Sequence, residues 1–225
     1  MATLSEFIQN SPWARSISAK HLAFVASAVV EHQLRKDEFV YRRGDPPTNW
    51  IGVIEGELRM VRFSRNGKMT ALWRVPAGDW IGEASLVFLG QRRFDLIAHR
   101  ASRIAYIPKD TFSWLFENSV PFNNYLVHKL AHRMGQMAAM LAVDRLQGAT
   151  ARTAFCLVSI AEAERKSSDE ELVKISQEQL GFLAGLSRQH ANRAVASLVK
   201  DGLIVLSNRR IVIHDLEGLK KLYDL

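Results

Sequence analysis

Residues 175–204 read ISQEQLGFLAGLSRQHANRAVASLVKDGLI, and they carry the strongest structural signal in the chain. Ser176 can cap a helix, and Gln179, three residues later, completes a capping box. Gly185 supplies the flexible position that a tight turn between helices often contains. Ser187 can then cap a second helix. The stretch therefore predicts two helices joined by a short turn.

The second of these helices has an apolar side and a polar side. Its apolar residues are spaced four and three apart and face inward: Ala191, Val195 and Leu198. Its outward residues are Arg188, Gln189, Asn192 and Arg193. Arginine pairs with guanine, and glutamine or asparagine pairs with adenine, when such a helix enters the major groove of DNA. An exposed amphipathic helix with an idle polar face is the alternative.

Two strands are predicted after this helix, over residues 203–206 and 210–214, with a turn at residues 207–209. They would form a wing beside the DNA phosphates, with Lys200 and Arg209 as phosphate contacts. Between Lys174 and Arg210 the chain has six basic and two acidic residues, an excess of four positive charges. The joint occurrence of caps, turn, polar face and wing favours DNA binding over the idle helix.

Residues 32–108 show a different pattern, with short alternating runs separated by turn signals. Asn66-Gly67 is the strongest hairpin signal, because both residue types tolerate a positive φ. Many short strands with regular turns predict a small barrel or roll. We expect a domain of N-terminal helices and this roll over residues 1–120.

A long helix is predicted over residues 121–147, with an apolar stripe at spacings of four, four, three and four. The stripe consists of Leu126, Leu130, Met134, Met137 and Leu141. We expect it to be the seam of a homodimer, although a helix packed on its own roll would show a similar stripe. Gly148 interrupts the helix, and residues 148–225 form the third predicted domain.

Composition limits the partners, the cysteine-dependent sites and the cellular location that we expect for this protein. It has 225 residues, a net charge of +7 and a sequence pI of about 9.8, which is compatible with nucleic acid as a partner. Its single cysteine, Cys156, excludes an internal disulfide and a cluster held by four cysteines of one chain. No apolar run is long enough to span a bilayer, and the N-terminus has no secretory pattern, so we expect a cytoplasmic protein without a membrane partner.

Several segments together resemble the family of the cyclic-AMP receptor protein and FNR. They are RRGDPP at residues 42–47, GVIEGELRM at 52–60, PAGDWIGEASL at 76–86 and the stretch at 175–204. The resemblance extends from about Val40 to His214. It implies an α+β fold with a cyclic-nucleotide-binding-type jelly roll, a central dimerisation helix and a C-terminal winged helix-turn-helix. It also implies a homodimeric regulator of transcription that binds palindromic DNA, and RNA polymerase if it is an activator.

By the same resemblance, Ser187, Arg188 and Arg193 contact DNA. Gln189 stands where a glutamate is usual in the best-known members. Glutamate accepts a hydrogen bond from cytosine, whereas glutamine both donates and accepts, so we expect a different half-site.

Family members that bind a cyclic nucleotide use a glutamate for the ribose and an Arg-Ser or Arg-Thr pair for the phosphate. Gly82-Glu83 matches the first element, and Arg92 or Arg93 falls at the second, but neither is followed by serine or threonine. The central helix also has Met137-Ala138-Ala139 where the adenine-reading hydroxyls would lie. Two readings stay open: the paired arginines bind a more anionic ligand, or Glu83 pairs with an arginine and the pocket is structural. A bound cyclic nucleotide is the third alternative.

Other functions have weaker support in the sequence. A cyclic-nucleotide-binding-type regulatory module without a DNA role is the main alternative, but it needs no recognition helix. His128 and His132 have a metal-compatible spacing but no third ligand, so we predict a solvated face and no metal. Glu83, Asp95 and His99 share the β-rich region without the spacing of a catalytic site, so we do not expect an enzyme.

Overall fold

In this computed structural model the chain divides into two compact units, one ending at Arg133 and one beginning at Met134. The structure describes residues 2–223 except Arg65, Lys68, Leu89, Gln147, residues 166–171, Lys174, Asn208 and Arg209. The division falls inside the long helix α5, Val120–Leu146, rather than at the predicted borders after residues 120 and 147. The three-part organisation of the chain therefore stays a prediction.

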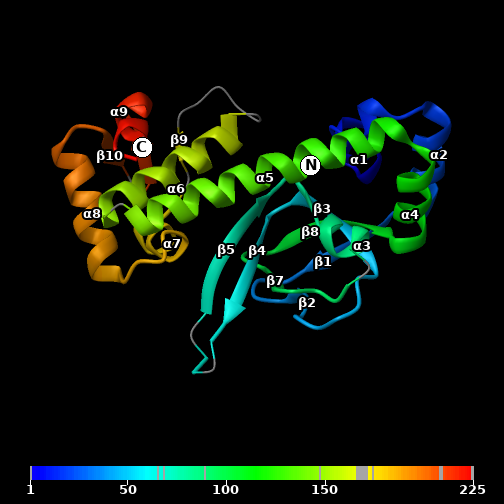
Figure 1. The fold of residues 1–225 in the computed structure, drawn as a ribbon, viewed down its shortest axis with the longest axis horizontal. Helices are drawn as coiled ribbons and strands as arrows, with labels where there is room; N and C mark the ends of the chain where they lie inside the picture. The colour runs from blue at the N-terminus through cyan, green and yellow to red at the C-terminus, as the bar shows by residue number, and fades with distance from the viewer. Residues whose placement is uncertain are drawn as a thin grey trace. The chain divides into compact units, whose positions relative to one another are not determined.

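The first unit contains two four-stranded antiparallel sheets, which confirms the predicted roll (Figure 1). One sheet has the order β1 (Val30–Leu34), β8 (Ser102–Pro108), β3 (Asn49–Glu55) and β6 (Trp80–Ile81). The other has the order β2 (Phe39–Tyr41), β7 (Asp95–Ala98), β4 (Glu57–Phe63) and β5 (Met69–Pro76). Strands β4 and β5 form the predicted hairpin, with Phe63 paired to Met69 and Gly67 at φ +77°.

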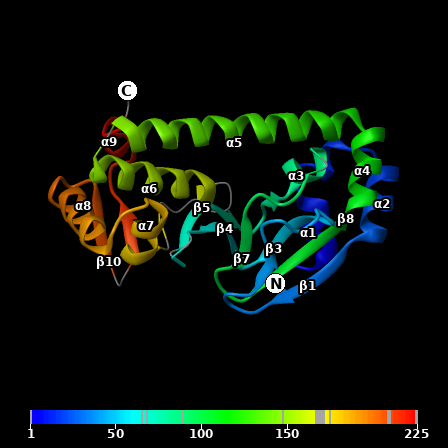
Figure 2. The same cartoon turned by 60° about the horizontal axis from the view of Figure 1, so that its bottom comes forward.

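Helices pack around one end of the roll, where α2 and α4 lie side by side (Figure 2). They are α1 (Leu4–Asn10), the 3₁₀ turn Ala14–Ser16, α2 (Ala19–Ala28) and α4 (Lys109–Asn118). A further short helix, α3 (Glu83–Val87), follows β6. The core between helices and roll is aromatic, because Trp13, Trp50 and Trp80 are fully buried there. The rings of Trp50 and Trp80 have centroids 4.5 Å apart, and those of Trp13 and Trp80 are 5.4 Å apart.

The second unit contains four helices besides the end of α5, and a three-stranded sheet, among its described residues. The helices are α6 (Ala149–Arg165), α7 (Gln177–Leu183), α8 (Arg188–Lys200) and α9 (Leu216–Lys221). The sheet has the order β10 (Ile204–Ser207), β11 (Arg210–Ile213) and β9 (Leu172–Val173). Gly148 separates α5 from α6, as predicted. The predicted α+β organisation is confirmed.

Cys156 packs against the apolar core of the second unit. Burial raises the pKa of this thiol to about 12, so it stays protonated at neutral pH. No helix among the described residues is long and apolar enough to cross a membrane.

Candidate nucleic-acid interface and effector site

The turn between α7 and α8 has the geometry that the sequence predicts. The Ser176 backbone N–H donates to Gln179 Oε1 at 3.0 Å, and the Gln179 backbone N–H donates to Ser176 Oγ at 3.2 Å, which completes the capping box. Gly185 adopts a φ of +65° between the helices. A Cβ at Gly181 would lie only 2.6 Å from Cβ of Ala191, so the missing side chain allows α7 to cross close to α8. The arrangement of α7 and α8 therefore depends on the cap of α7, the left-handed Gly185 in the turn and the close approach of the two helices at Gly181.

Helix α8 buries the residues predicted to face inward and exposes the polar ones. Its buried residues are Ala191, Ala194, Val195 and Leu198. The exposed residues include all five predicted DNA contacts near its N-terminus: Ser187, Arg188, Gln189, Asn192 and Arg193. Lys200 is also exposed, at the last position of the helix. The exposed surface at the N-terminal half of α8 is therefore rich in hydrogen-bond donors and acceptors.

His190 belongs to this surface and is missing from the sequence-based prediction. It is exposed, and its Nδ1 lies 2.7 Å from Oγ of Ser187. The same Oγ accepts the His190 backbone N–H at 3.4 Å, which caps α8. The spacing of three residues from the cap could have indicated this contact, since a side chain at that position reaches back to the cap.

The predicted wing is present as β10 and β11. The two strands pair from Ile204–Ile213 to Ser207–Arg210, and β11 also pairs with β9. Arg209, one of the two predicted phosphate contacts, lies outside the described residues. The first strand of the wing begins shortly after α8 ends, following the turn at Asp201-Gly202.

In the first unit, the predicted effector residues Gly82, Glu83 and Arg92 lie together. Gly82 has a φ of +104°, and its carbonyl accepts from Arg92 Nη1 at 3.0 Å. Arg92 Nη2 donates to the Asn49 carbonyl at 2.5 Å, and the Arg92 guanidinium carbon lies 4.3 Å from the centre of the Tyr41 ring. Arg92 is only 3% exposed, and this burial lowers the pKa of its guanidinium.

Arg93 does not join this group. It is exposed, and its carbonyl accepts from Arg62 Nη1 at 3.4 Å. Of the two arginines, Arg92 is buried and Arg93 is exposed. The two adjacent arginines thus differ in burial, and their joint binding of one ligand stays a hypothesis.

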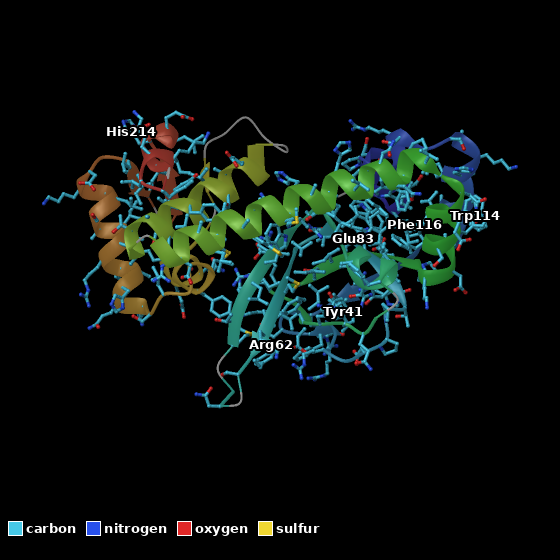
Figure 3. All side chains as sticks on the ribbon, in the orientation of Figure 1. Tyr41, Arg62, Glu83, Trp114, Phe116 and His214 are labelled. Atoms are coloured by element: carbon cyan, nitrogen blue, oxygen red, sulfur yellow. The ribbon has the colours of Figure 1, made fainter. Side chains whose placement is uncertain are left out.

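Glu83 is 1% exposed, and both of its carboxylate oxygens are hydrogen-bonded. Trp50 Nε1 donates to Oε2 at 3.1 Å, and Arg133 Nη1 of α5 donates to Oε1 at 2.5 Å. Figure 3 shows Glu83 beside α5. The partner of Glu83 is thus an arginine of the helix, whereas Arg92 forms no ion pair with a described residue.

Arg133 belongs to an ion cluster that the sequence analysis missed. Its Nη2 donates to Asp79 Oδ2 at 2.9 Å and to the Trp80 carbonyl at 2.8 Å, and Lys129 Nζ also donates to Asp79. Burial raises the pKa of Asp79, but the two cations outweigh this effect and leave it below the ordinary value. Burial also lowers the pKa of Lys129. Lys129 and Arg133 are four residues apart, a spacing that places them on one face of α5.

These contacts do not fit a cyclic nucleotide bound in the way the resemblance implies. The glutamate for the ribose is already held by Trp50 and Arg133. The arginine for the phosphate is held by two carbonyls and lacks the neighbouring hydroxyl. The second reading, a structural pocket in which Glu83 pairs with an arginine, agrees with the contacts.

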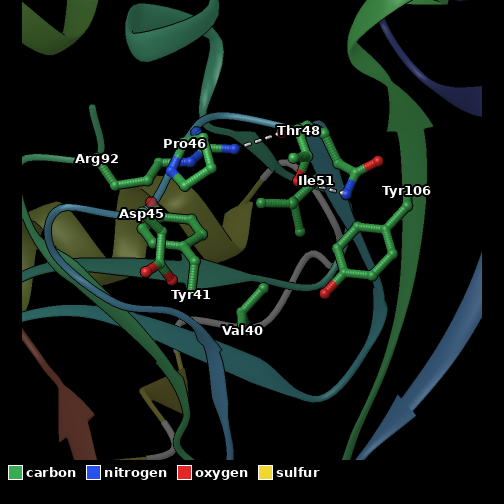
Figure 4. Close-up of a pocket in the computed structure, with 9 residues that line it drawn as sticks. Val40, Tyr41, Asp45, Pro46, Thr48, Ile51, Arg92 and Tyr106 are labelled. Atoms are coloured by element: carbon green, nitrogen blue, oxygen red, sulfur yellow. Dashed lines mark hydrogen bonds between the residues drawn. The ribbon is translucent and has the colours of Figure 1, made fainter. Parts of the chain in front are cut away.

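A cavity of about 220 Å³ lies beside Arg92 (Figure 4). Its walls include Tyr41, Tyr106, Ile51 and Asp45. The residues that line the cavity include neither Glu83 nor Arg133.

The predicted dimer seam on α5 is only partly available at the protomer surface. Leu126 is 2% exposed and packs in the aromatic core of the first unit, so its assignment to the seam is wrong. Leu130 is half-buried, whereas Met134, Met137 and Leu141 are 71%, 45% and 48% exposed. Val127, which the prediction omitted, is 64% exposed and lies seven residues before Met134.

Two family models match this chain, one in each part. The cyclic nucleotide-binding domain matches residues 31–119, and the Crp-like helix-turn-helix domain matches residues 151–222. The chain is 24% identical over 205 residues to a CRP-like cAMP-activated global transcriptional regulator of Mycobacterium tuberculosis, covering 87% of this chain and 91% of the relative. It is 25% identical over 187 residues to the cAMP-activated global transcriptional regulator CRP of Haemophilus influenzae, covering 81% and 83%.

Solved structures share the fold. FixK2 from Bradyrhizobium japonicum aligns with a TM-score of 0.76 at 20% identity, covering 88% of this chain and 98% of that one. The c-di-GMP responsive global regulator CLP of Xanthomonas campestris aligns with a TM-score of 0.67 at 20% identity, covering 87% and 99%. With the capped helix-turn-helix, the wing and the roll in place, the chain belongs to the CRP/FNR family of DNA-binding transcription regulators.

Proposed function

We propose that two copies of the chain bind a palindromic DNA site, with one α8 helix in the major groove of each half-site. The observation that carries this proposal is the polar surface of Arg188, Gln189, Asn192 and Arg193 on a capped, well-packed helix. Such a helix offers its N-terminal residues to base edges, and the half-sites of a dimer lie about one helical turn apart.

The α5 helix supplies the proposed dimer seam. Val127, Met134 and Leu141 are spaced seven residues apart, which is the heptad period of a coiled-coil seam. Their exposed fractions in the protomer are 64%, 71% and 48%. Because a row of large exposed apolar side chains is typical of an interaction surface, we expect it to pack against the same helix of a second copy.

We also propose that the roll binds no cyclic nucleotide. The Glu83 carboxylate pairs with Arg133 instead of binding the ribose of a nucleotide. Relatives of this fold are named for cAMP and for c-di-GMP, so the fold alone does not specify the ligand. Titration calorimetry with cyclic AMP and cyclic GMP should give no binding heat. Tight binding of either nucleotide would contradict this part of the proposal.

RNA polymerase is the expected further partner if the protein is an activator. We place the protein in the cytoplasm because its proposed partner is DNA, and we expect no catalytic activity.

Selection of binding sites from a random DNA pool tests the proposal. The parent protein should select a palindrome, and replacing a base-reading arginine, Arg188 or Arg193, with alanine should cost about 1–3 kcal/mol and relax one position in each half-site. Gln189→Glu should shift preference toward cytosine, because a carboxylate only accepts.

Lys200→Ala is the matched control, since a phosphate contact weakens all sequences alike and reduces the salt slope by about one. An unchanged motif in both arginine variants would show that α8 does not read the bases.

A further inference from the structure

The N-terminus of α8 carries a hydroxyl–imidazole pair on its exposed side. Ser187 Oγ accepts the His190 backbone N–H at 3.4 Å and lies 2.7 Å from His190 Nδ1. Both residues are exposed beside the proposed base-reading side chains. The position of the proton in this pair decides what Ser187 can offer to DNA.

A serine hydroxyl has one proton and two acceptor sites. When the imidazole is neutral with its proton on Nε2, Nδ1 can only accept, so the hydroxyl donates its proton to His190. Ser187 then has no donor for a phosphate oxygen. When Nδ1 is protonated, as it always is in the imidazolium form, Nδ1 donates to Oγ instead, and the hydroxyl proton is released.

We propose that His190 positions the Ser187 hydroxyl for a DNA phosphate, and that each recognition helix takes up a proton when it binds DNA. This inference rests on the proposed function, because it assigns a further residue to the α8–DNA interface. The N-terminus of a helix attracts a phosphate through its free N–H groups and its dipole. A phosphate at that place accepts from the released hydroxyl and attracts the imidazolium, so binding and protonation favour each other.

The surrounding charges give the sign of the effect. Arg188 and Arg193 are the cationic residues nearest to His190 in the sequence of α8. The described titratable groups on the elements packed against α8 are Glu178 on α7, and Arg152, Cys156 and Glu162 on α6, while β10 has none. None of them forms an ion pair with His190 in the described part of the chain. DNA phosphate is therefore the anion that favours protonation, and affinity rises as the pH falls.

The test is DNA affinity against pH, measured by fluorescence anisotropy at constant ionic strength with the duplex that the parent selects from the random pool. Histidine titrates between about pH 5 and 8, so the range from pH 8 to 5.5 is appropriate. The parent's affinity should rise by roughly tenfold over this range, as one added hydrogen bond in each half-site would produce. His190→Gln should show a flat profile, because glutamine does not titrate.

Two further variants test whether the pH dependence comes from the contact between His190 and Ser187 or from the charge of any exposed histidine. His214→Gln removes another exposed histidine of the second unit and should keep the parent's profile. Ser187→Gly lacks the hydroxyl but retains most of the capping strength. It keeps the attraction between phosphate and imidazolium but loses the released donor, so its rise in affinity should be clearly smaller than the parent's. Circular dichroism of each variant checks that the helices are intact.

The outcomes are distinct. A rise that persists in His190→Gln, or a rise in Ser187→Gly as large as the parent's, overturns the inference, because the titrating group or its route to DNA would then be different. A parent that selects a motif but binds it equally at all pH values also overturns it, while leaving the proposed function standing. A parent that selects no DNA refutes the proposed function itself.

Discussion

The buried contact between Glu83 and Arg133 permits a quantitative prediction for Arg133→Met. The arginine side chain is 14% exposed and donates to Glu83, Asp79 and the Trp80 carbonyl. Methionine preserves much of the packing of the stem but removes the charge. Glu83, at 1% exposure, would keep Trp50 as its only hydrogen-bond donor among the described residues. Breaking a buried pair in this way costs about 3–5 kcal/mol, so the free energy of unfolding of the first unit should fall by that amount.

Tryptophan fluorescence during urea unfolding measures this unit selectively. All five tryptophans of the chain, Trp13, Trp50, Trp73, Trp80 and Trp114, precede Met134. Arg152→Met is the matched control, because Arg152 pairs with Asp144 in the second unit, where the side chains are 28% and 56% exposed. An exposed pair contributes about 0–1 kcal/mol, and its loss should leave the tryptophan transition unchanged.

A loss of less than about 1 kcal/mol in Arg133→Met would refute the reasoning, since Glu83 would then have to be neutral or solvated. Adding Glu83→Gln to Arg133→Met should recover part of the loss, because the double variant buries no unpaired charge.

Three other predictions concern different parts of the chain. Met134→Asp places a charge in the proposed seam and should convert the dimer to a monomer in sedimentation experiments; a variant that stays dimeric would place the seam elsewhere. The pKa of Asp79 is below its ordinary value in the folded protein, so its contribution to stability is present above about pH 4 and is lost as the pH falls through the folded pKa. The stability difference between the parent and Asp79→Asn, measured by urea unfolding at several pH values, should therefore shrink in acid. Cys156, whose thiol pKa is raised to about 12, should react much more slowly with a thiol reagent at pH 8 in the native protein than in denaturant, and equal rates would contradict the raised pKa.

Elements that have a local cause could be predicted from the sequence alone. Ser176 with Gln179, Gly185 and Ser187 specify the two helices and the turn between them, because caps and left-handed turns depend on residues at most a few positions apart. The same holds for the Asn66-Gly67 hairpin and for the inward face of α8, which follows from a helical period.

The partners of the buried polar groups depend on how distant segments pack together. Glu83 and Arg133 are fifty residues apart, and no local pattern pairs them. The choice between Arg92 and Arg93 likewise depends on which one turns into the roll. Leu126 matches the apolar stripe of α5 in the sequence, yet it packs in its own core, because the aromatic cluster covers that part of the helix. Helical periodicity shows that a residue faces an apolar neighbour, but only the packing of distant segments shows which neighbour it is.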